Sequence, residues 1–198
     1  MNKKYGLSAV HSDVVYVYPA YLSHLDGLSI LDVGCGSGRT LLYLEKMGHR
    51  VTGVDSNQSA LETIQDIVKK EALSAVDTLL HDLNQPLSME PEYYDLVLST
   101  VTLQFLNPQR IPALLAELQA ATQKNGYHFL VFPVQDALYA LPDFFTYMPE
   151  KEQLYHVYQN SGWSVIEYKE SVGQLHKKDE QGRLISGLFG FLLAQKHS

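Results

Sequence analysis

The fold is decided by the stretch Ile30-Leu31-Asp32-Val33-Gly34-Cys35-Gly36-Ser37-Gly38-Arg39, in which an apolar run leads into a loop with glycine at every second position. Glycine allows the backbone to turn sharply after a strand, and it leaves room for a ligand because it has no Cβ atom. The helix that follows presents unpaired backbone N–H groups at its N-terminus, which suits a polar or anionic ligand. The stretch therefore predicts the floor of a nucleotide-type pocket.

The periodicity of apolar residues around this loop predicts alternating strands and helices. Residues 10–25 are expected to form a helix that is bent or broken near Pro19. Strands are predicted at 28–33, 51–54, 75–80, 94–99, 127–132, 163–169 and 184–194. Helices are predicted at 38–48, 58–70, 107–123 and 150–160, the third with Asn107 as N-cap and Pro108 as its first residue. The alternation indicates a mostly parallel α/β sheet covered on both faces, and the last two strands, joined by a polar segment, indicate an antiparallel edge.

The composition is that of an ordinary globular protein, and the 198 residues fit a single domain, 1–198. The formal net charge is −7, which argues against nucleic acid as a partner because that affinity depends on neutralising phosphates. Cys35 is the only cysteine and the histidines are scattered, so no disulfide framework and no metal site are expected.

The sequence also predicts where the protein is found. The longest apolar run, at 184–194, is too short to cross a bilayer. His11 and Asp13 interrupt the segment that a signal peptide would need to be apolar. We therefore expect a cytoplasmic protein that does not bind membranes, either a monomer or a homodimer.

Polar residues follow four of the predicted strands: Asp32, Asp55, Asp82 and the pair Ser99-Thr100. Ligands bind open α/β sheets beyond the carboxyl ends of the strands, so these residues are expected to share one rim. Asp55 comes 21 residues after Gly34, a suitable distance for a carboxylate that binds ribose hydroxyls. Each aspartate alone is better explained by the preference of aspartate for strand ends and caps. Together with the glycine loop, the set favours a nucleoside-binding rim.

The glycine spacing narrows the choice of ligand. A dinucleotide fingerprint has the spacing Gly-x-Gly-x-x-Gly, whereas this chain has Gly-x-Gly-x-Gly followed by Arg39. A Gly-Lys-Ser/Thr sequence is also missing, which disfavours a nucleoside triphosphate.

Residues 31–38 resemble the first motif of class I S-adenosylmethionine (SAM)-dependent methyltransferases, and the resemblance extends over 28–135. It implies a Rossmann-like, doubly wound, seven-stranded sheet with 28–135 as the SAM-binding core. It also implies that the loop backbone holds the methionine end of SAM, that Asp55 binds the ribose, that Asp82 and Leu83 flank the adenine, and that Thr100 and Val101 lie near the methyl-donor end. The cofactor-binding residues implied are Asp32, Gly34, Cys35, Gly36, Ser37, Gly38, Arg39, Asp55, Ser56, Asp82, Leu83, Thr100 and Val101.

A longer set of motifs is similar to TehB, a family of small tellurite-resistance methyltransferases. These motifs lie at 5–7, 11–13, 82–84, 95–101, 126–127 and 173–176. The resemblance implies SAM-dependent methylation of tellurium or selenium oxyanions. It implies that residues 1–26 form a helical lid segment in which Tyr5 and His11 lie near the substrate, and that 163–196 is a C-terminal strand pair.

A basic cluster lies between the last two strands. We interpret His176, Lys177 and Arg183 as the catalytic residues that bind or orient the substrate, although a solvated hairpin turn explains the same residues. The family pattern has arginine where this chain has Lys177 and Leu184, with Arg183 one position earlier. Lysine and arginine are not equivalent in binding an oxyanion, and neighbouring strand residues point to opposite faces. Methyl transfer is therefore better supported than a metalloid acceptor.

Two alternatives remain open. The chain could be an O-, S- or N-methyltransferase of another small molecule, or a SAM-binding module that has lost the chemistry. Ser99-Thr100-Val101 differs from the Asn-Pro-Pro-Tyr sequence found where nucleic-acid amines are methylated, in agreement with the negative charge.

Overall fold

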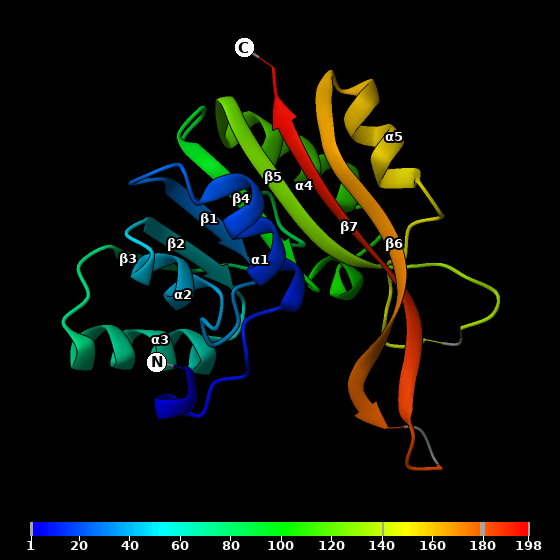
Figure 1. Cartoon of the computed structure of the whole chain (residues 1–198), viewed down its shortest axis with the longest axis horizontal. Coiled ribbons are helices and arrows are strands. Elements are labelled where there is room, and N and C mark those ends of the chain that lie inside the picture. Colours follow the sequence, from blue (N-terminus) through cyan, green and yellow to red (C-terminus); the bar gives the residue numbers. More distant parts are fainter. Residues whose placement is uncertain (1, 140, 179–180, 198) are drawn as a thin grey trace.

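The computed structural model describes residues 2–139, 141–178 and 181–197, without the side chains of His176 and Lys177. Its centre is a seven-stranded sheet in the order β3-β2-β1-β4-β5-β7-β6 (Figure 1). The strands are β1 (Ser29–Val33), β2 (Arg50–Asp55), β3 (Val76–Leu80), β4 (Tyr94–Thr100), β5 (Thr122–Val134), β6 (Trp163–Lys178) and β7 (Leu184–Lys196). The first five are parallel, and β7 is antiparallel to both β5 and β6. The predicted α/β sheet with an antiparallel C-terminal edge is confirmed.

Helices cover both faces of this sheet (Figure 1). One layer holds α1 (Ser12–Val17), the π-helical turn η2 (Tyr18–Leu22), α2 (Leu41–Lys46) and α3 (Gln58–Glu71), and the other holds α4 (Ile111–Ala121) and α5 (Gln153–Asn160). Two short 3-10 turns, η1 (Asn2–Tyr5) and η3 (Leu103–Phe105), complete the described elements. None of the helices in the described ranges combines the length and the apolar character needed to cross a membrane.

Successive side chains of the central strands point alternately to the two faces of the sheet and pack into both helical layers. Ile30 and Leu96 pack in the cluster under α1–α3, whereas Leu31 and Val97 pack in the cluster under α4 and α5. These side chains are at most 2% exposed, so the strands are buried on both faces and appear in the sequence as continuous apolar runs.

Several predicted helix boundaries were wrong. The first helix is shorter than 10–25, and it changes to a π-helical turn at Tyr18, next to Pro19, which lacks the N–H of a regular helical bond. The helix expected over 107–123 begins at Ile111, because the Asn107 side chain accepts a hydrogen bond from Gln109 N (3.0 Å) in a local turn.

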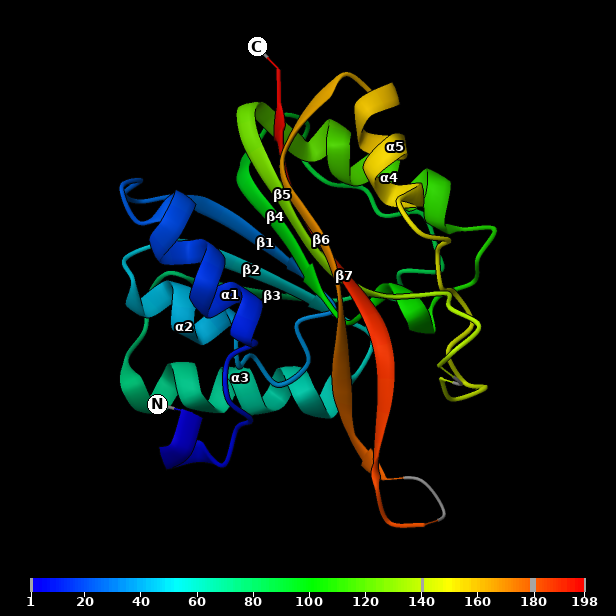
Figure 2. The same ribbon diagram turned by 45° about the vertical axis from the view of Figure 1, so that its right-hand side comes forward.

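The strands at the antiparallel edge are longer than predicted. β5 begins at Thr122 rather than at 127, and β6 continues to Lys178 rather than ending at 169. Most of the expected polar segment between the last two strands is therefore paired strand, from Glu170 opposite Gly190 to Lys178 opposite Leu184. The last pair between β5 and β7 is Val134 with Leu188, so the end of the hairpin, residues 173–178 and 184–187, extends beyond β5 as a two-stranded arm (Figure 2).

A buried polar network joins β5 to α5. The His128 ring lies 2.7 Å from the Thr122 hydroxyl through Nε2 and 2.6 Å from the Tyr158 hydroxyl through Nδ1. Thr122 donates its proton to the Leu118 carbonyl (2.8 Å), so it accepts from Nε2–H, and Nδ1 accepts from Tyr158. The ring is thus neutral, and burial lowers the pKa of His128 to about 3.

This network predicts sensitivity to acid. In the unfolded chain a histidine takes up a proton near pH 6.5, but folded His128 does not, so the free energy of unfolding falls as the pH decreases below about 6.5. The contribution approaches about 1.4 kcal/mol per pH unit. We expect urea unfolding of His128→Gln to show a shallower pH dependence between pH 6 and 4 than that of the wild type. The control is His156→Gln, an exposed histidine on α5; equal slopes in the wild type and His128→Gln would contradict the assignment.

Candidate functional site

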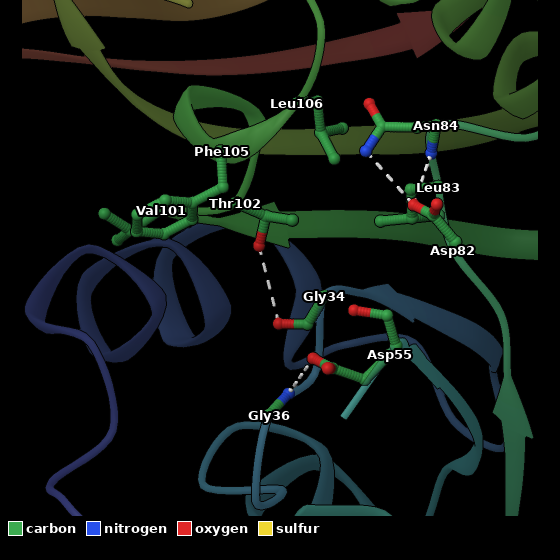
Figure 3. A pocket seen from close by; sticks show the side chains of 11 residues that line it. Gly34, Gly36, Asp55, Asp82, Leu83, Asn84, Val101, Thr102, Phe105 and Leu106 are labelled. Carbon is green, nitrogen blue, oxygen red and sulfur yellow. Dashed lines mark hydrogen bonds between the residues drawn. The ribbon is translucent and has the colours of Figure 1, made fainter. Parts of the chain in front are cut away.

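Three cavities meet where the glycine loop faces the end of β4. Cavity A, about 340 Å³, is lined by Gly34, Gly36, Asp55, Ser56, Asp82, Leu83, Asn84, Val101, Thr102, Phe105 and Leu106 (Figure 3). Cavity B, about 260 Å³, is lined by Leu7, Ser8, Asp32, Gly34, Cys35, Gly36, Ser37, Arg39, Thr40 and Thr100. Cavity C, about 370 Å³, is lined by His11, Ser12, Asp13, Arg39, Val101, Ser171, Val172, Gly173, Gln174, Leu175 and Phe189.

The cavities adjoin through shared residues. Gly34 and Gly36 line both A and B, Val101 lines both A and C, and Arg39 lines both B and C. A ligand that lies across the glycine loop therefore fills A and B together and reaches the edge of C.

The conformation of the loop requires glycine. Gly34 has a φ of +75°, and a Cβ atom there would lie 2.2 Å from side-chain atoms of Thr102. Gly36 has a φ of +53°, and its N–H donates to Asp55 Oδ2 at 2.8 Å (Figure 3). A Cβ on Gly36 would meet no atom within 4 Å, so this glycine presents open backbone to the cavities.

Two carboxylates line cavity A: Asp55 is the last residue of β2, and Asp82 follows β3. Asp55 Oδ1 accepts from the N–H of Asn57 (2.9 Å), and Asp82 Oδ1 accepts from the N–H of Asn84 (2.9 Å). Each carboxylate offers about four acceptor positions, so both can accept further hydrogen bonds from the hydroxyl or amino groups of a ligand.

Asp32 is a third carboxylate, at the end of β1, and it lines cavity B. It is 1% exposed, and neither of its oxygens has a hydrogen-bond partner among the described residues. Burial raises the pKa of Asp32 to about 7; the Arg39 guanidinium lowers it, the Asp55 carboxylate raises it, and the backbone N–H of Leu41 lowers it by the smallest amount. A buried carboxylate without a partner is costly, and a ligand with an ammonium group would supply the partner. The residues present therefore fit the methionine end of SAM.

Val101, between cavities A and C, has an unfavourable backbone conformation. Its φ of +59° is left-handed, which a β-branched side chain disfavours at a cost of about 1–3 kcal/mol. Such conformations concentrate at functional sites, where the surrounding structure holds them in place.

Cavity C is built from segments that lie far apart in the sequence. His11 is the N-cap of α1, where its Nδ1 accepts from the N–H of Asp13 (3.3 Å). Arg39 brings a guanidinium, and Val172 and Phe189 come from the paired strands β6 and β7. Among the described residues, the lining thus combines the Arg39 guanidinium and the Asp13 carboxylate with an apolar wall.

The structure brings together all the predicted cofactor residues except Gly38 in the linings of cavities A and B. Gly38 instead allows the loop to pack closely against α3, because a Cβ atom there would lie 2.8 Å from the Ile64 side chain. His11 lines cavity C, whereas the Tyr5 hydroxyl donates to Glu71 at the end of α3 and Tyr5 lines none of the three cavities.

Of the three predicted catalytic residues, the structure describes the side chain of Arg183 alone, and Arg183 is not among the residues that line the three cavities. Arg183 is exposed next to the turn of the arm, with Nη2 3.3 Å from Gln181 Oε1. The side chains of His176 and Lys177 lie outside the described part of the structure. Within the described ranges, no group of three or more His, Cys, Asp or Glu residues is arranged to hold a metal ion.

Some residues that line cavities A and B were not predicted from the sequence. Asn84 follows Asp82 in a recognised motif and could have been found there, as could Ser8, which lies close to the motif at 5–7. Thr102 and Phe105 carried no such signal.

The family model and the relatives with the highest identity over nearly the whole chain identify its family. The sequence model of "Tellurite resistance protein TehB" matches residues 1–193. The chain is 34% identical over 197 residues to the probable SAM-dependent methyltransferase TehB of Haemophilus influenzae (strain 10810), which covers 98% of this chain and 65% of the relative. It is 30% identical over 197 residues to hemagglutinin 1 of Eikenella corrodens, covering 98% of this chain and 62% of the relative.

A solved structure gives the same result. The crystal structure of TehB from Haemophilus influenzae matches with a TM-score of 0.88 and 33% identity, over 98% of this chain and 65% of that chain. The chain thus spans less than two thirds of the length of the curated relatives that it matches. On these matches, the chain belongs to the TehB family of tellurite resistance proteins.

Proposed function

We propose that this chain binds SAM across cavities A and B and transfers its methyl group to a small acceptor in cavity C. The observation that carries the proposal is the junction of the three cavities at Gly34, Gly36, Val101 and Arg39. The name of the Haemophilus influenzae relative, a probable SAM-dependent methyltransferase, supports the choice of cofactor.

Each end of the cofactor would meet residues suited to it. Asp55 and Asp82 in cavity A would accept hydrogen bonds from the adenosine part, and Asp32 in cavity B would pair with the ammonium group of the methionine part. The backbone at Gly36 allows close approach between them. The linings of both cavities therefore suit one extended ligand.

When bound, SAM supplies a methyl group already activated on a sulfonium, so no covalent enzyme intermediate is needed. The task of the protein is to align the acceptor with the methyl–sulfur bond and to exclude water. Val101, at the boundary of A and C, would form part of the wall along which donor and acceptor meet.

The acceptor proposed is a tellurite- or selenite-type oxyanion, as the family description suggests. An oxyanion needs positive charge near the methyl group, and Arg39 supplies a guanidinium at cavity C. His176, Lys177 and Arg183 are proposed to bind or orient the acceptor, and Tyr5 and His11 to act in a lid formed by residues 1–26. These assignments rest on the resemblance to the family.

A second candidate acceptor follows from the apolar wall of cavity C, formed by Val101, Val172, Leu175 and Phe189. This wall favours a small organic thiol, carboxylate or amine over a fully hydrated anion. Location in the cytoplasm and a monomeric or homodimeric state stay predictions.

The first test measures cofactor binding and turnover. We expect calorimetry to detect binding of SAM and of S-adenosylhomocysteine, and we expect S-adenosylhomocysteine to form when SAM and tellurite are supplied. Asp55→Ala removes a charged acceptor worth about 1.5–3 kcal/mol, so SAM should bind roughly 10- to 100-fold more weakly. Asp66→Ala, an exposed aspartate on α3, is the control.

The outcomes separate the alternatives. Turnover of a thiol or an amine but not of tellurite or selenite would favour the second acceptor class. Binding of SAM without product from any acceptor would favour a non-catalytic module. Absence of SAM binding would contradict the proposal as a whole.

The raised pKa of Asp32 predicts that SAM binding depends on pH. Below pH 7 the carboxyl of the free protein is protonated, and pairing with an ammonium group requires that it lose this proton. We expect the affinity for SAM to rise between pH 5.5 and 7, by at most about tenfold per unit, with proton release detected by calorimetry in buffers of different ionisation enthalpy. Asp32→Asn should abolish both effects; an unchanged pH profile in that variant would exclude Asp32 as the partner.

The role proposed for the arm is tested at two neighbouring positions. His176→Ala should lower turnover of tellurite without changing the affinity for SAM. Lys177→Arg restores the family residue and should raise turnover, because a planar guanidinium binds an oxyanion through two hydrogen bonds. Lys178→Arg is the matched control. Unchanged turnover in both His176→Ala and Lys177→Arg would remove these residues from the catalytic assignment.

A further inference from the structure

The wall between cavities A and C depends on a backbone conformation that valine disfavours. Val101 has a φ of +59°, and of the described non-glycine residues with positive φ it is the one with a β-branched side chain. It is also the one that lines cavities A and C. A conformation of this kind persists only where neighbouring groups hold it. The groups that hold Val101 therefore determine the position of this wall.

Hydrogen bonds fix both peptide groups of Val101. Its N–H donates to the Val131 carbonyl at 2.8 Å, which continues the pairing of β4 with β5. Its carbonyl accepts from Nε2 of Gln104 at 2.7 Å. The first bond belongs to the sheet, whereas the second depends on one side chain.

Gln104 is an unusual residue to bury. It is 0% exposed, and its Oε1 has no hydrogen-bond partner among the described residues. Burying an amide with an unsatisfied acceptor opposes folding, so an apolar side chain of similar size would serve stability alone at least as well. What Gln104 offers that an apolar residue lacks is the donor to Val101.

The backbone of Gln104 is itself anchored. Its carbonyl accepts from the N–H of Thr146 at 2.7 Å, and the Thr146 hydroxyl lies 2.7 Å from the Leu106 carbonyl. Phe145 packs edge-on against Phe105 with ring centres 5.5 Å apart. The turn η3 is thus tied to residues 145–146, and the carboxamide is a donor in a fixed place.

We propose that Gln104 is a positioning residue for methyl transfer, whose carboxamide holds the Val101 carbonyl and with it the wall along which donor and acceptor meet. The inference rests on the proposed function, because that function places the donor in cavity A and the acceptor in cavity C. Gln104 acts through Val101, and a displacement of about 1 Å between reacting groups can lower a rate by about 100-fold.

The test replaces Gln104 with methionine, which keeps the length of the side chain and removes the donor. SAM should bind Gln104→Met within about twofold of the wild type, because Asp32 and Asp55 stay in place, whereas kcat with tellurite should fall about tenfold. Gln159→Met is the control, because Gln159 also donates one 2.7 Å hydrogen bond, to the Tyr155 hydroxyl, on the exposed side of α5. It should match the wild type in both measurements.

The same change made in a second variant, Val101→Gly, distinguishes a positioning role of Gln104 from a general loss of structure. Glycine adopts the left-handed conformation without strain, so in Val101→Gly the added change Gln104→Met should lower kcat by less than about threefold. An equal loss of kcat in both backgrounds would overturn the proposal, as would an unchanged kcat in Gln104→Met alone.

The proposal can fail separately from the proposed function. If the wild type binds SAM but methylates no acceptor, the methyltransferase function fails, and a crystal structure of Gln104→Met then decides the role of the side chain. If the backbone of Val101 leaves the left-handed region in this variant, the result supports the role of Gln104 in holding Val101. If Val101 keeps a positive φ, the result overturns that role.

Discussion

The site depends on how closely the turn after β1 approaches the end of β4. Thr102 occupies the place that any side chain at position 34 would need, and the N–H of Gly34 donates to the Val54 carbonyl of β2 at 2.8 Å. The sheet order reverses at this point, with β2 on one side of β1 and β4 on the other. Ligand crevices form where the order reverses, and here the backbone of Gly34 packs closely against the Thr102 side chain at that point. The glycine loop can face cavities A and B because its first residue fits under Thr102.

The charge along the rim follows from this geometry. β1, β2 and β3 end side by side, so Asp32, Asp55 and Asp82 come to one edge. Asp32 and Asp55 repel each other, and Arg39 is the cation that partly offsets this at Asp32. A ligand with positive charge is favoured at such an edge, whereas the phosphates of a dinucleotide would meet like charge. The carboxylates thus favour a sulfonium and an ammonium over a dinucleotide, which the glycine spacing disfavours on separate grounds.

What could be predicted from the sequence follows from burial. β1 and β4 are apolar on both faces, so their runs predict them to within a residue or two. The arm is strand without being core, and its exposed polar residues carry no alternation that could predict it. The prediction that a helix begins at Asn107 was wrong because asparagine is as typical of a turn as of a helix N-cap. The left-handed Val101 was beyond prediction because valine opposes that conformation, and only the assembled neighbours at Val131 and Gln104 hold it.

Cavity C, where we propose that the acceptor binds, was harder to predict than cavities A and B. Cavities A and B are built mainly from the glycine loop and the ends of parallel strands, where the sequence carries recognisable motifs. Cavity C combines the start of α1, Arg39, the end of β4 and the arm, which no local pattern connects. A change in the arm can therefore alter cavity C without disturbing the glycine loop. One scaffold can therefore keep its glycine loop while the lining of the neighbouring cavity changes, because the two are built mainly from different segments of the chain.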